Sequence, residues 1–135
     1  MLFGNTSDGE QYSKIIDLLH QWTVESSYIA DNIEMLNQKS QKIFLHLTYH
    51  WIENIRQHLL IQSDMLSNMD KTIPRPKLIE NEIKMSFRHL NKYLKKQKQI
   101  PKIDYIKFHS LIESLYQLGG IIDKITNILW DDRVN

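Results

Sequence analysis

The sequence predicts an all-α protein, an antiparallel four-helix bundle, and three observations support that fold class. No glycine occurs between Glu10 and Leu118, and no proline occurs before Pro74. Because these two residue types break helices most strongly, their absence over such a length favours helix. Apolar residues recur three or four positions apart through most of the chain, as they do on one face of a helix. Finally, 135 residues of which 41% are hydrophobic suffice for one domain with a single core.

The first expected helix covers about residues 11–36 and follows a flexible lead-in at residues 1–9. Two of the four glycines lie in that lead-in, and Ser7 or Asp8 is suited to cap the helix. The apolar residues that keep the helical period are Ile15, Leu18, Leu19, Trp22, Ile29, Ile33 and Leu36. We expect the bundle domain to cover residues 10–131 and a short tail to follow at residues 132–135.

A polar interruption at residues 37–40 separates the first helix from a second one over residues 41–69. A single unbroken helix through this point is the alternative. The residues expected to be buried on the second helix are Phe44, Leu47, Trp51, Ile55, Leu59 and Leu66. His58 falls on the same side, so we expect it to be buried and hydrogen-bonded. Two prolines within residues 70–76 end this helix, because proline cannot continue one.

The third helix, over residues 77–98, carries an apolar face made of Ile79, Ile83, Phe87, Leu90 and Leu94. Residues 98–102, which include Pro101, end it, and Asp104 is expected to cap the fourth helix. The apolar stripe of that last helix is the longest: Tyr105, Phe108, Leu111, Ile112, Leu115, Leu118, Ile122, Ile125 and Leu129. Gly119 and Gly120 interrupt it, and such a pair indicates either close backbone approach to a neighbour or a bend.

Charge is distributed unevenly along the chain, although the formal net charge is only +1. Residues 1–38 hold one base and six acids, a net charge of −5, whereas residues 75–107 hold ten bases and three acids, a net charge of +7. On the third helix the bases gather opposite the apolar face. Such a face either binds an anionic partner or simply keeps the surface solvated. The residues that we expect to contact nucleic acid are Lys77, Lys84, Arg88, Lys92, Lys95, Lys96 and Lys98.

Histidines at helical spacing raise the hypothesis of a metal site. His46 and His50, with Glu53, lie on one side of the second helix, and His109 and Glu113 repeat the spacing on the fourth. Metal-binding bundles use such pairs, but their ligands point inward from facing helices. Both sets lie at the rim of the apolar stripe or outside it. We therefore expect no bound metal.

No other group of residues is typical of an active site. The chain has no cysteine, which excludes disulfides, thiolate metal sites and thiol catalysis. It also has no glycine-rich phosphate loop, no nucleophile motif, and no arginine followed four to six residues later by histidine. We expect a non-enzymatic protein without a cofactor. Because no apolar run approaches the ~18 residues of a membrane span and the acidic start is unlike a signal peptide, a cytoplasmic location is expected.

Part of the third helix resembles a sequence pattern of a known family. The pattern is apolar–Arg–x–x–apolar–Arg–aromatic–Leu, and here residues 87–94 read Phe-Arg-His-Leu-Asn-Lys-Tyr-Leu. Arg88 matches the pattern, Lys92 is a conservative change, and Asn91 departs from it. The second helix shows a weaker resemblance to the same family, where Lys39-x-x-Lys42 precedes Phe44.

The fourth helix contains a second motif. The residues that match it are Tyr105, Glu113 and Leu118-Gly119-Gly120, while Leu115 replaces an expected glycine and Ile121 an expected tryptophan. On these residues the stretch from 79 to 125 resembles the accessory variability (Avd) proteins of diversity-generating retroelements. It also resembles their sister four-helix-bundle proteins, which are encoded within bacterial large-subunit rRNA genes.

The resemblance implies a non-enzymatic bundle that forms a ring-like homo-oligomer, typically a pentamer. It further implies docking on the reverse transcriptase of the retroelement and contact with template RNA or its cDNA, a single-stranded DNA, to support mutagenic cDNA synthesis. Contact with phosphates through lysine and arginine supplies affinity without reading sequence. Two alternatives stay open: a bundle that binds only protein, and a histidine-ligated metal-binding bundle.

Two further expectations concern the helix surfaces. Tyr93 is the one aromatic residue of the basic face that could stack on a base, and we expect it to lie in the core instead. Apolar residues outside the main stripes predict self-association, because oligomers bury such residues against neighbouring copies. Those residues are Leu78, Met85, Ile121 and Ile128.

Overall fold

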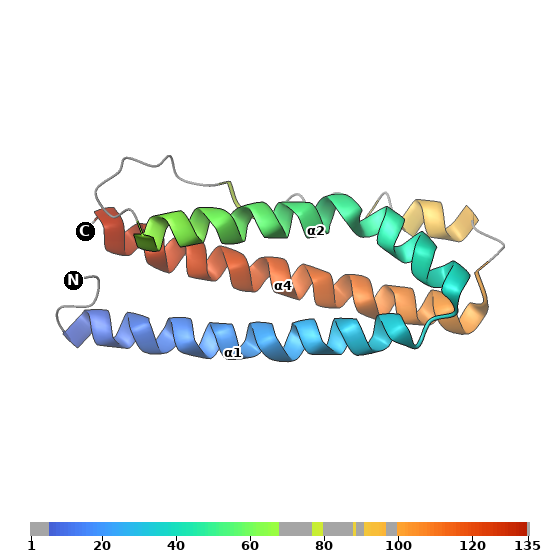
Figure 1. Ribbon diagram of the computed structural model, residues 1–135, viewed down its shortest axis with the longest axis horizontal. Coiled ribbons are helices and arrows are strands. Elements are labelled where there is room, and N and C mark those ends of the chain that lie inside the picture. Colours follow the sequence, from blue (N-terminus) through green and yellow to red (C-terminus); the bar gives the residue numbers. More distant parts are fainter. Residues whose placement is uncertain (1–5, 68–76, 80–87, 89–90, 97–99, 135) are drawn as a thin grey trace.

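The computed structural model describes residues 6–67, 77–79, 88, 91–96 and 100–134. They form three long helices, α1 (Thr6–Glu34), α2 (Gln38–Ser67) and α4 (Lys102–Val134), and a helical segment at residues 91–96. No strand occurs among these residues, and the fold class, an all-α four-helix bundle, is confirmed. Figure 1 shows α1 running antiparallel to both α2 and α4.

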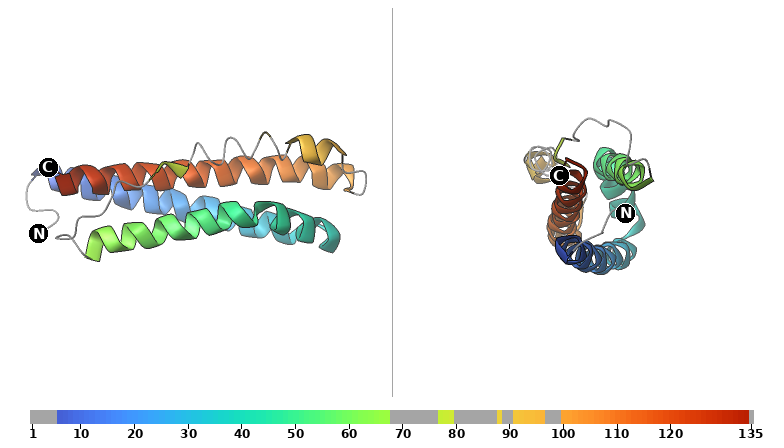
Figure 2. Two further views of the ribbon diagram at one scale, coloured as in Figure 1. Left: turned by 90° about the horizontal axis from the view of Figure 1, so that it is seen from above. Right: turned by 90° about the vertical axis from the view of Figure 1, so that its left-hand side faces the viewer.

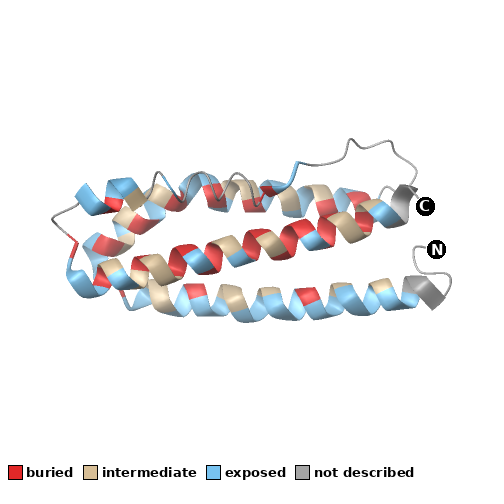
Figure 3. Ribbon diagram, turned by 180° about the vertical axis from the view of Figure 1, so that it is seen from behind, coloured by how far each residue is buried: buried red, intermediate tan, exposed pale blue. Residues whose placement is uncertain are grey.

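Helix α4 is the centre of the packing. Both α1 and α2 pack on it, and the end-on view in Figure 2 places α1, α2 and the segment 91–96 around it. Buried residues accordingly follow one another along α4, whereas they are sparse along α1 (Figure 3). The stripe predicted for α4 is confirmed except that Tyr105 is half-buried: the buried residues include Phe108, Leu111, Ile112, Leu115, Leu118, Ile122, Ile125 and Leu129.

The link between α1 and α2 is shorter than predicted. It comprises residues 35–37, so the unbroken helix is excluded, and residues 38–40 form the first turn of α2 instead of the link. Asn37 is the reason, because its Oδ1 accepts a hydrogen bond from the Ser40 amide at 2.8 Å. A side-chain acceptor at this position caps a helix N-terminus. The Leu36 carbonyl, left over at the end of α1, accepts from the Gln41 side chain at 3.0 Å.

The ends of the first and the last helix also differ from the prediction. Helix α1 begins at Thr6, so residues 6–9 of the expected lead-in are helical, and Ser7 and Asp8 lie inside the helix rather than capping it. Helix α4 begins at Lys102 and extends to Val134, through most of the expected tail. Asp104 therefore lies in its first turn and is not the cap. Its Oδ2 instead accepts a hydrogen bond from the Ser40 hydroxyl at 2.7 Å, in the protein interior.

The apolar face predicted for the third helix is confirmed where the structure describes it. Ile79 and Leu94 are fully buried, while Arg88, Lys92 and Lys95 are exposed. The helix-breaking residues 70–76, and the core positions Ile83, Phe87 and Leu90, lie outside the described residues. The Ile79 amide donates a hydrogen bond to Asp123 Oδ1 of α4 at 2.8 Å, which fixes the beginning of this element against the central helix.

Along α2 the predicted core residues were correct up to Ile55 except for Leu47, and wrong beyond it. Phe44, Trp51 and Ile55 are buried and Leu47 is half-buried, whereas Leu59 and Leu66 are exposed. The buried positions in the second half are held by other residues, among them Gln62 and Met65. Gln62 can be buried because its Nε2 donates to the Ile122 carbonyl and to Thr126 Oγ1 of α4, each at 3.0 Å. On α1, Leu19 is likewise exposed instead of buried.

Two findings along α4 bear on the predictions. A methyl group built on Gly120 has no atom within 4 Å, so this glycine does not lie against another backbone of the described chain. Ile121 is buried and Ile128 is half-buried against the same apolar cluster, which contains Leu18, Met65, Ile125 and Leu129. They belong to the bundle core rather than to an outlying surface. Leu78 is partly exposed, and Met85 lies outside the described residues.

The buried Ser40–Asp104 hydrogen bond leads to a stability prediction. Replacing Ser40 with alanine leaves a buried carboxyl oxygen without its donor, which we expect to lower the free energy of unfolding by about 1–3 kcal/mol. Ser63→Ala, at an exposed position of the same helix, is the matched control and should change it by less than about 0.5 kcal/mol. Chemical denaturation followed by circular dichroism measures both. Equal stability of the two variants would contradict the assigned role of this hydrogen bond.

Candidate nucleic-acid interface

The described members of the predicted basic set all lie at the surface. Arg88, Lys92, Lys95 and Lys96 are exposed, with Leu94 between them as the buried anchor. Lys77 is exposed too but precedes the helix rather than belonging to it. Lys84 and Lys98 lie outside the described residues. Within the described part of the chain, none of the exposed members of this set forms an ion pair with a carboxylate, so their charge is available to an anionic partner.

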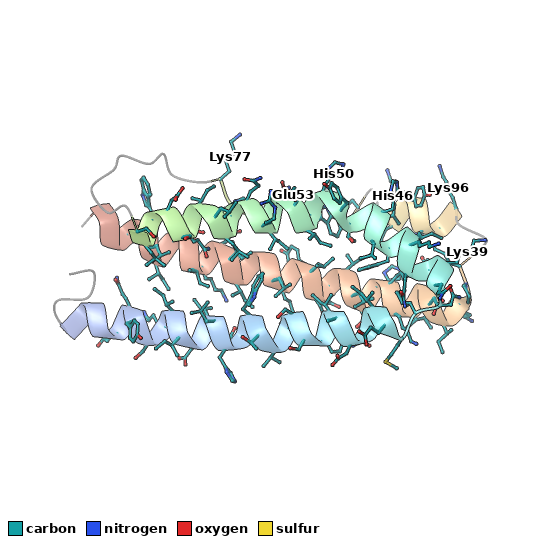
Figure 4. The ribbon with its side chains drawn as sticks, viewed as in Figure 1. Lys39, His46, His50, Glu53, Lys77 and Lys96 are labelled. Atoms are coloured by element: carbon teal, nitrogen blue, oxygen red, sulfur yellow. The ribbon has the colours of Figure 1, made fainter. Side chains whose placement is uncertain are left out.

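A second row of basic and titratable side chains runs along the outer face of α2, and the sequence reasoning missed it as a binding surface. Its members, Lys39, Lys42, His46 and His50, are all exposed. Helical spacing places them opposite the buried stripe that contains Phe44 and Trp51. The spacing of three or four residues could have predicted this row from the sequence, but the two histidines were interpreted only as possible metal ligands. Figure 4 shows His46, His50 and Lys96 on the same side of the molecule.

Glu53, one of the two acidic residues of α2, is neutralised by its neighbour. The Glu53 carboxylate, next along the row, accepts two hydrogen bonds from Arg56 Nε at 3.1 Å and a further one from the same guanidinium. These hydrogen bonds to Arg56 lower the pKa of Glu53 from its ordinary value. Because the pair carries no net charge, Glu53 opposes anion binding on α2 less than a free carboxylate would.

The fold also gathers lysines from separate parts of the chain at one end of the bundle. Helix α2 and helix α4 both begin there, and the segment 91–96 lies there as well (Figure 1). We call this region the basic end. Its lysines are Lys39, Lys42, Lys92, Lys95, Lys96, Lys102 and Lys107. Asp104, also at this end, is buried. Lys107 is half-buried, and its Nζ donates to the Met35 carbonyl at 3.4 Å, so its ammonium group lies near the link between α1 and α2.

Helix α1 presents the opposite charge on the opposite side. Between Thr6 and Glu34 it contains one base, Lys14, and six acids, a net charge of −5. In Figures 1 and 2, α1 lies across α4 from both α2 and the segment 91–96. Most of the negative charge that the sequence predicted for the first 38 residues thus lies on the side of α4 away from the segment 91–96, and only the last turn of α1, which ends at Glu34, adjoins the basic end.

Tyr93 was expected in the core and lies at the surface. Its side chain is 45% exposed. The physical reason is helical geometry: Tyr93 is one position before the buried Leu94, about 100° around the helix from it. An aromatic ring therefore stands among the exposed lysines of this segment.

The histidines form no metal site in the described part of the chain. No group of three or more histidine, aspartate or glutamate side chains there is placed to hold a metal ion. His109 packs against the ring of Tyr105 on its own helix, with ring centroids 4.8 Å apart. His58 is half-buried rather than buried, and it is hydrogen-bonded as expected.

His58 connects α2 to the beginning of the third element. Its Nδ1 lies 2.9 Å from the Asn54 carbonyl oxygen and its Nε2 lies 2.8 Å from the Lys77 carbonyl oxygen. Carbonyl oxygens only accept hydrogen bonds, so a neutral imidazole donates its one N–H to one of them and a protonated ring donates to both. In either form the ring lies between the middle of α2 and the residues next to Ile79.

A groove lies between α1 and α4, away from the predicted nucleic-acid-binding residues. Two neighbouring hollows of about 510 and 280 Å³ share Val24, Glu25 and Gln117 as lining residues. The smaller one is also lined by Glu113 and by Tyr28 and Ser110, whose hydroxyls are hydrogen-bonded at 2.8 Å. None of the predicted nucleic-acid-binding residues lines either hollow.

No family model, curated protein or solved structure was found to match the chain. No helix in the described part of the structure is both long enough and apolar enough to span a membrane.

The position of His58 leads to a prediction. His58→Leu removes the ring nitrogens that face the Asn54 and Lys77 carbonyl oxygens, and we expect the free energy of unfolding to fall by about 1–2 kcal/mol. His46→Leu, on the exposed face of the same helix, should change it by less than about 0.5 kcal/mol. Thermal and urea unfolding of the two variants and the parent measure the difference. If His46→Leu proved as costly as His58→Leu, the contact with Lys77 would not be what stabilises this region.

Proposed function

We propose that this protein is a non-enzymatic accessory protein that binds RNA or single-stranded DNA through its basic side. By the basic side we mean the surface formed by the exposed cations of residues 88–96 and of α2. The observation that carries the proposal is the set of exposed cations Arg88, Lys92, Lys95 and Lys96, none of which has an ion-pair partner among the described residues. Lys39 and Lys42 of α2 extend this surface. Its net positive charge, on the side of the molecule away from the acidic α1, is suited to a polyanion.

The chemistry of this surface is contact with phosphate groups. Lysine and arginine at a phosphate release condensed counterions, which supplies affinity without sequence readout. The exposed side chains are spread over two elements, so they can contact several phosphates along a strand. No specific base-reading group is needed for such binding, and the role that follows is to hold nucleic acid, not to select a sequence.

The biological setting that we propose comes from the resemblance to accessory variability proteins of diversity-generating retroelements. There the nucleic acid is template RNA or its cDNA, the partner is the reverse transcriptase, and the place of action is the cytoplasm. The α1–α4 groove, lined by Glu25 and Glu113 and by apolar Val24, supports a separate docking place for the protein partner. Since it lies away from the basic residues, both partners can be bound together.

Self-association into a ring-like homo-oligomer, such as the pentamer of that family, is the second part of the proposal. The exposed apolar residues Leu45, Ile52, Leu59 and Leu66 recur every seven residues along α2. A seven-residue apolar repeat is the pattern by which helices pack on one another. In a single copy these side chains are 40–51% exposed, and a neighbouring copy would remove them from water.

This apolar row also favours the alternative function, a bundle that binds only protein. In that case the basic side would dock on an acidic partner, and RNA would not compete. Metal binding by histidine is the weaker alternative, because His46 and His50 are exposed and lack a facing ligand in the described part of the chain. Metal analysis of the purified protein decides it.

The proposal predicts how removal of charge affects binding. Replacing both Arg88 and Lys92 with glutamine should weaken binding of RNA by roughly five- to thirtyfold, taking about 0.5–1 kcal/mol for each exposed charge pair. The effect should be similar for unrelated sequences, and the log–log slope of affinity against salt should fall by roughly 0.7 for each phosphate that is no longer neutralised. Fluorescence anisotropy at several salt concentrations measures both effects.

The matched control removes the same charge elsewhere. Lys14 and Lys124 are exposed on α1 and α4, and changing both to glutamine should leave the affinity within about twofold of the parent, since distant exposed charges are screened by salt. If the Arg88 and Lys92 variant bound RNA as well as the parent at physiological salt, these residues would merely keep the surface solvated.

A second prediction concerns assembly. Glutamate at both Ile52 and Leu59 should convert an oligomer into monomers at micromolar concentration, because charges would then have to be buried without partners. The control places glutamates at His50 and Gln57, which are exposed on the outer face of the same helix, and should leave the oligomer intact. Sedimentation velocity distinguishes the species. A parent protein that sediments only as a monomer would remove support for the ring.

A further inference from the structure

We propose that the nucleic acid held by this surface is a single strand, and that Tyr93 is a platform on which one of its bases stacks. This inference rests on the proposed function and goes beyond it, because phosphate contact alone does not distinguish a single strand from a duplex. It depends on where the structure places the aromatic rings of the basic side.

Tyr93 has the setting that stacking requires. Its side chain is 45% exposed, and the segment that carries it is held in place by Leu94, which is only 1% exposed. Lys92 is its chain neighbour and Lys96 lies one helical turn further on, on the same side of the segment. The described part of the chain offers its phenol no hydrogen bond. A base stacked on this ring would have its own backbone phosphates within reach of the two ammonium groups.

A second exposed ring lies on α2. Tyr49 is 60% exposed, and its ring meets that of His50 edge to face, with centroids 5.7 Å apart. Lys42 and His46 stand on the same outer part of the helix, and Figure 4 shows His46 and His50 on the side of the molecule that carries Lys96. Each of the two elements therefore carries an exposed tyrosine beside its cations, a combination found on surfaces that bind single strands without sequence preference.

The geometry of RNA makes the inference specific for single strands. In an A-form duplex the bases are stacked on one another and their faces are covered, so a tyrosine on a protein surface can reach only phosphates, sugars and groove edges. In a single strand the bases can turn outward and stack on an aromatic ring. Removing the ring should thus weaken binding of the single strand and leave binding of the duplex unchanged.

The experiment compares two RNA probes on the full chain. One is an unstructured oligouridine of about 15 nucleotides, within the site sizes of single-strand binders, and the other is a blunt duplex of the same length. Tyr93→Leu keeps an apolar side chain and the same charge. We expect it to weaken binding of the single strand roughly five- to hundredfold, with no change of the salt slope and no change of duplex binding.

Two further variants separate stacking from structure. Tyr12→Leu is the matched control, because Tyr12 is 51% exposed on the acidic α1, and it should leave binding of both probes unchanged. Tyr93→Trp, which keeps a large flat ring, should restore the affinity for the single strand. Circular dichroism and the unfolding midpoint show that each variant is folded.

The outcomes distinguish this inference from the proposed function. If the parent binds neither probe, the proposed function itself fails. If the parent binds RNA but Tyr93→Leu binds the single strand as well as the parent does, stacking is overturned and phosphate contact remains. Equal weakening for the single strand and the duplex in a folded Tyr93→Leu variant overturns stacking too, since it means that the ring positions the lysines.

Discussion

The arrangement of the bundle depends on hydrogen bonds that end at two buried aspartates of α4. Asp104 and Asp123 are each only 4% exposed, and a buried carboxyl oxygen without a donor is costly. Asp104 receives its hydrogen bond from the hydroxyl of Ser40 on α2, and Asp123 receives one from the amide of Ile79. Apolar contacts tolerate sliding along a helix, but these hydrogen bonds do not. The beginnings of α2 and of the third element are thereby fixed in register against the central helix.

The surface that we propose for nucleic acid follows from this register. The hydrogen bond at Asp104 sets where α2 begins and so where Lys39 and Lys42 stand, while the one at Asp123 sets the start of the element that leads to Lys92 and Lys96. The burial of Leu94 then fixes which side of that element faces solvent. Polar interactions inside the bundle thus determine how charged residues far apart in the sequence come to share one side of it.

Hydrophobic periodicity predicted the fold class and the exposed basic face well, because both depend on the spacing of residues along single helices. It failed where two neighbouring apolar residues compete for the core, as at Leu66 beside Met65, since the partner helix decides which one is buried. It also failed for Tyr93, which lies about 100° around the helix from the buried Leu94 and is exposed. The basic end could not have been predicted, because Lys39, Lys96 and Lys102 meet only through the tertiary arrangement. Asn37 was readable as a helix cap but was assigned to the turn.

The separation of charge across α4 gives the molecule an electric dipole moment directed from α1 towards the basic side. In the field of a polyanion such a molecule experiences a torque before any contact is made, and it approaches with its lysines leading. Encounters in which the acidic α1 faces the polyanion become rare. This raises the association rate at low ionic strength more than it changes the lifetime of the complex. In the proposed complex, α1 would face solvent, and the bound molecule would present an acidic helix on the side opposite the nucleic acid.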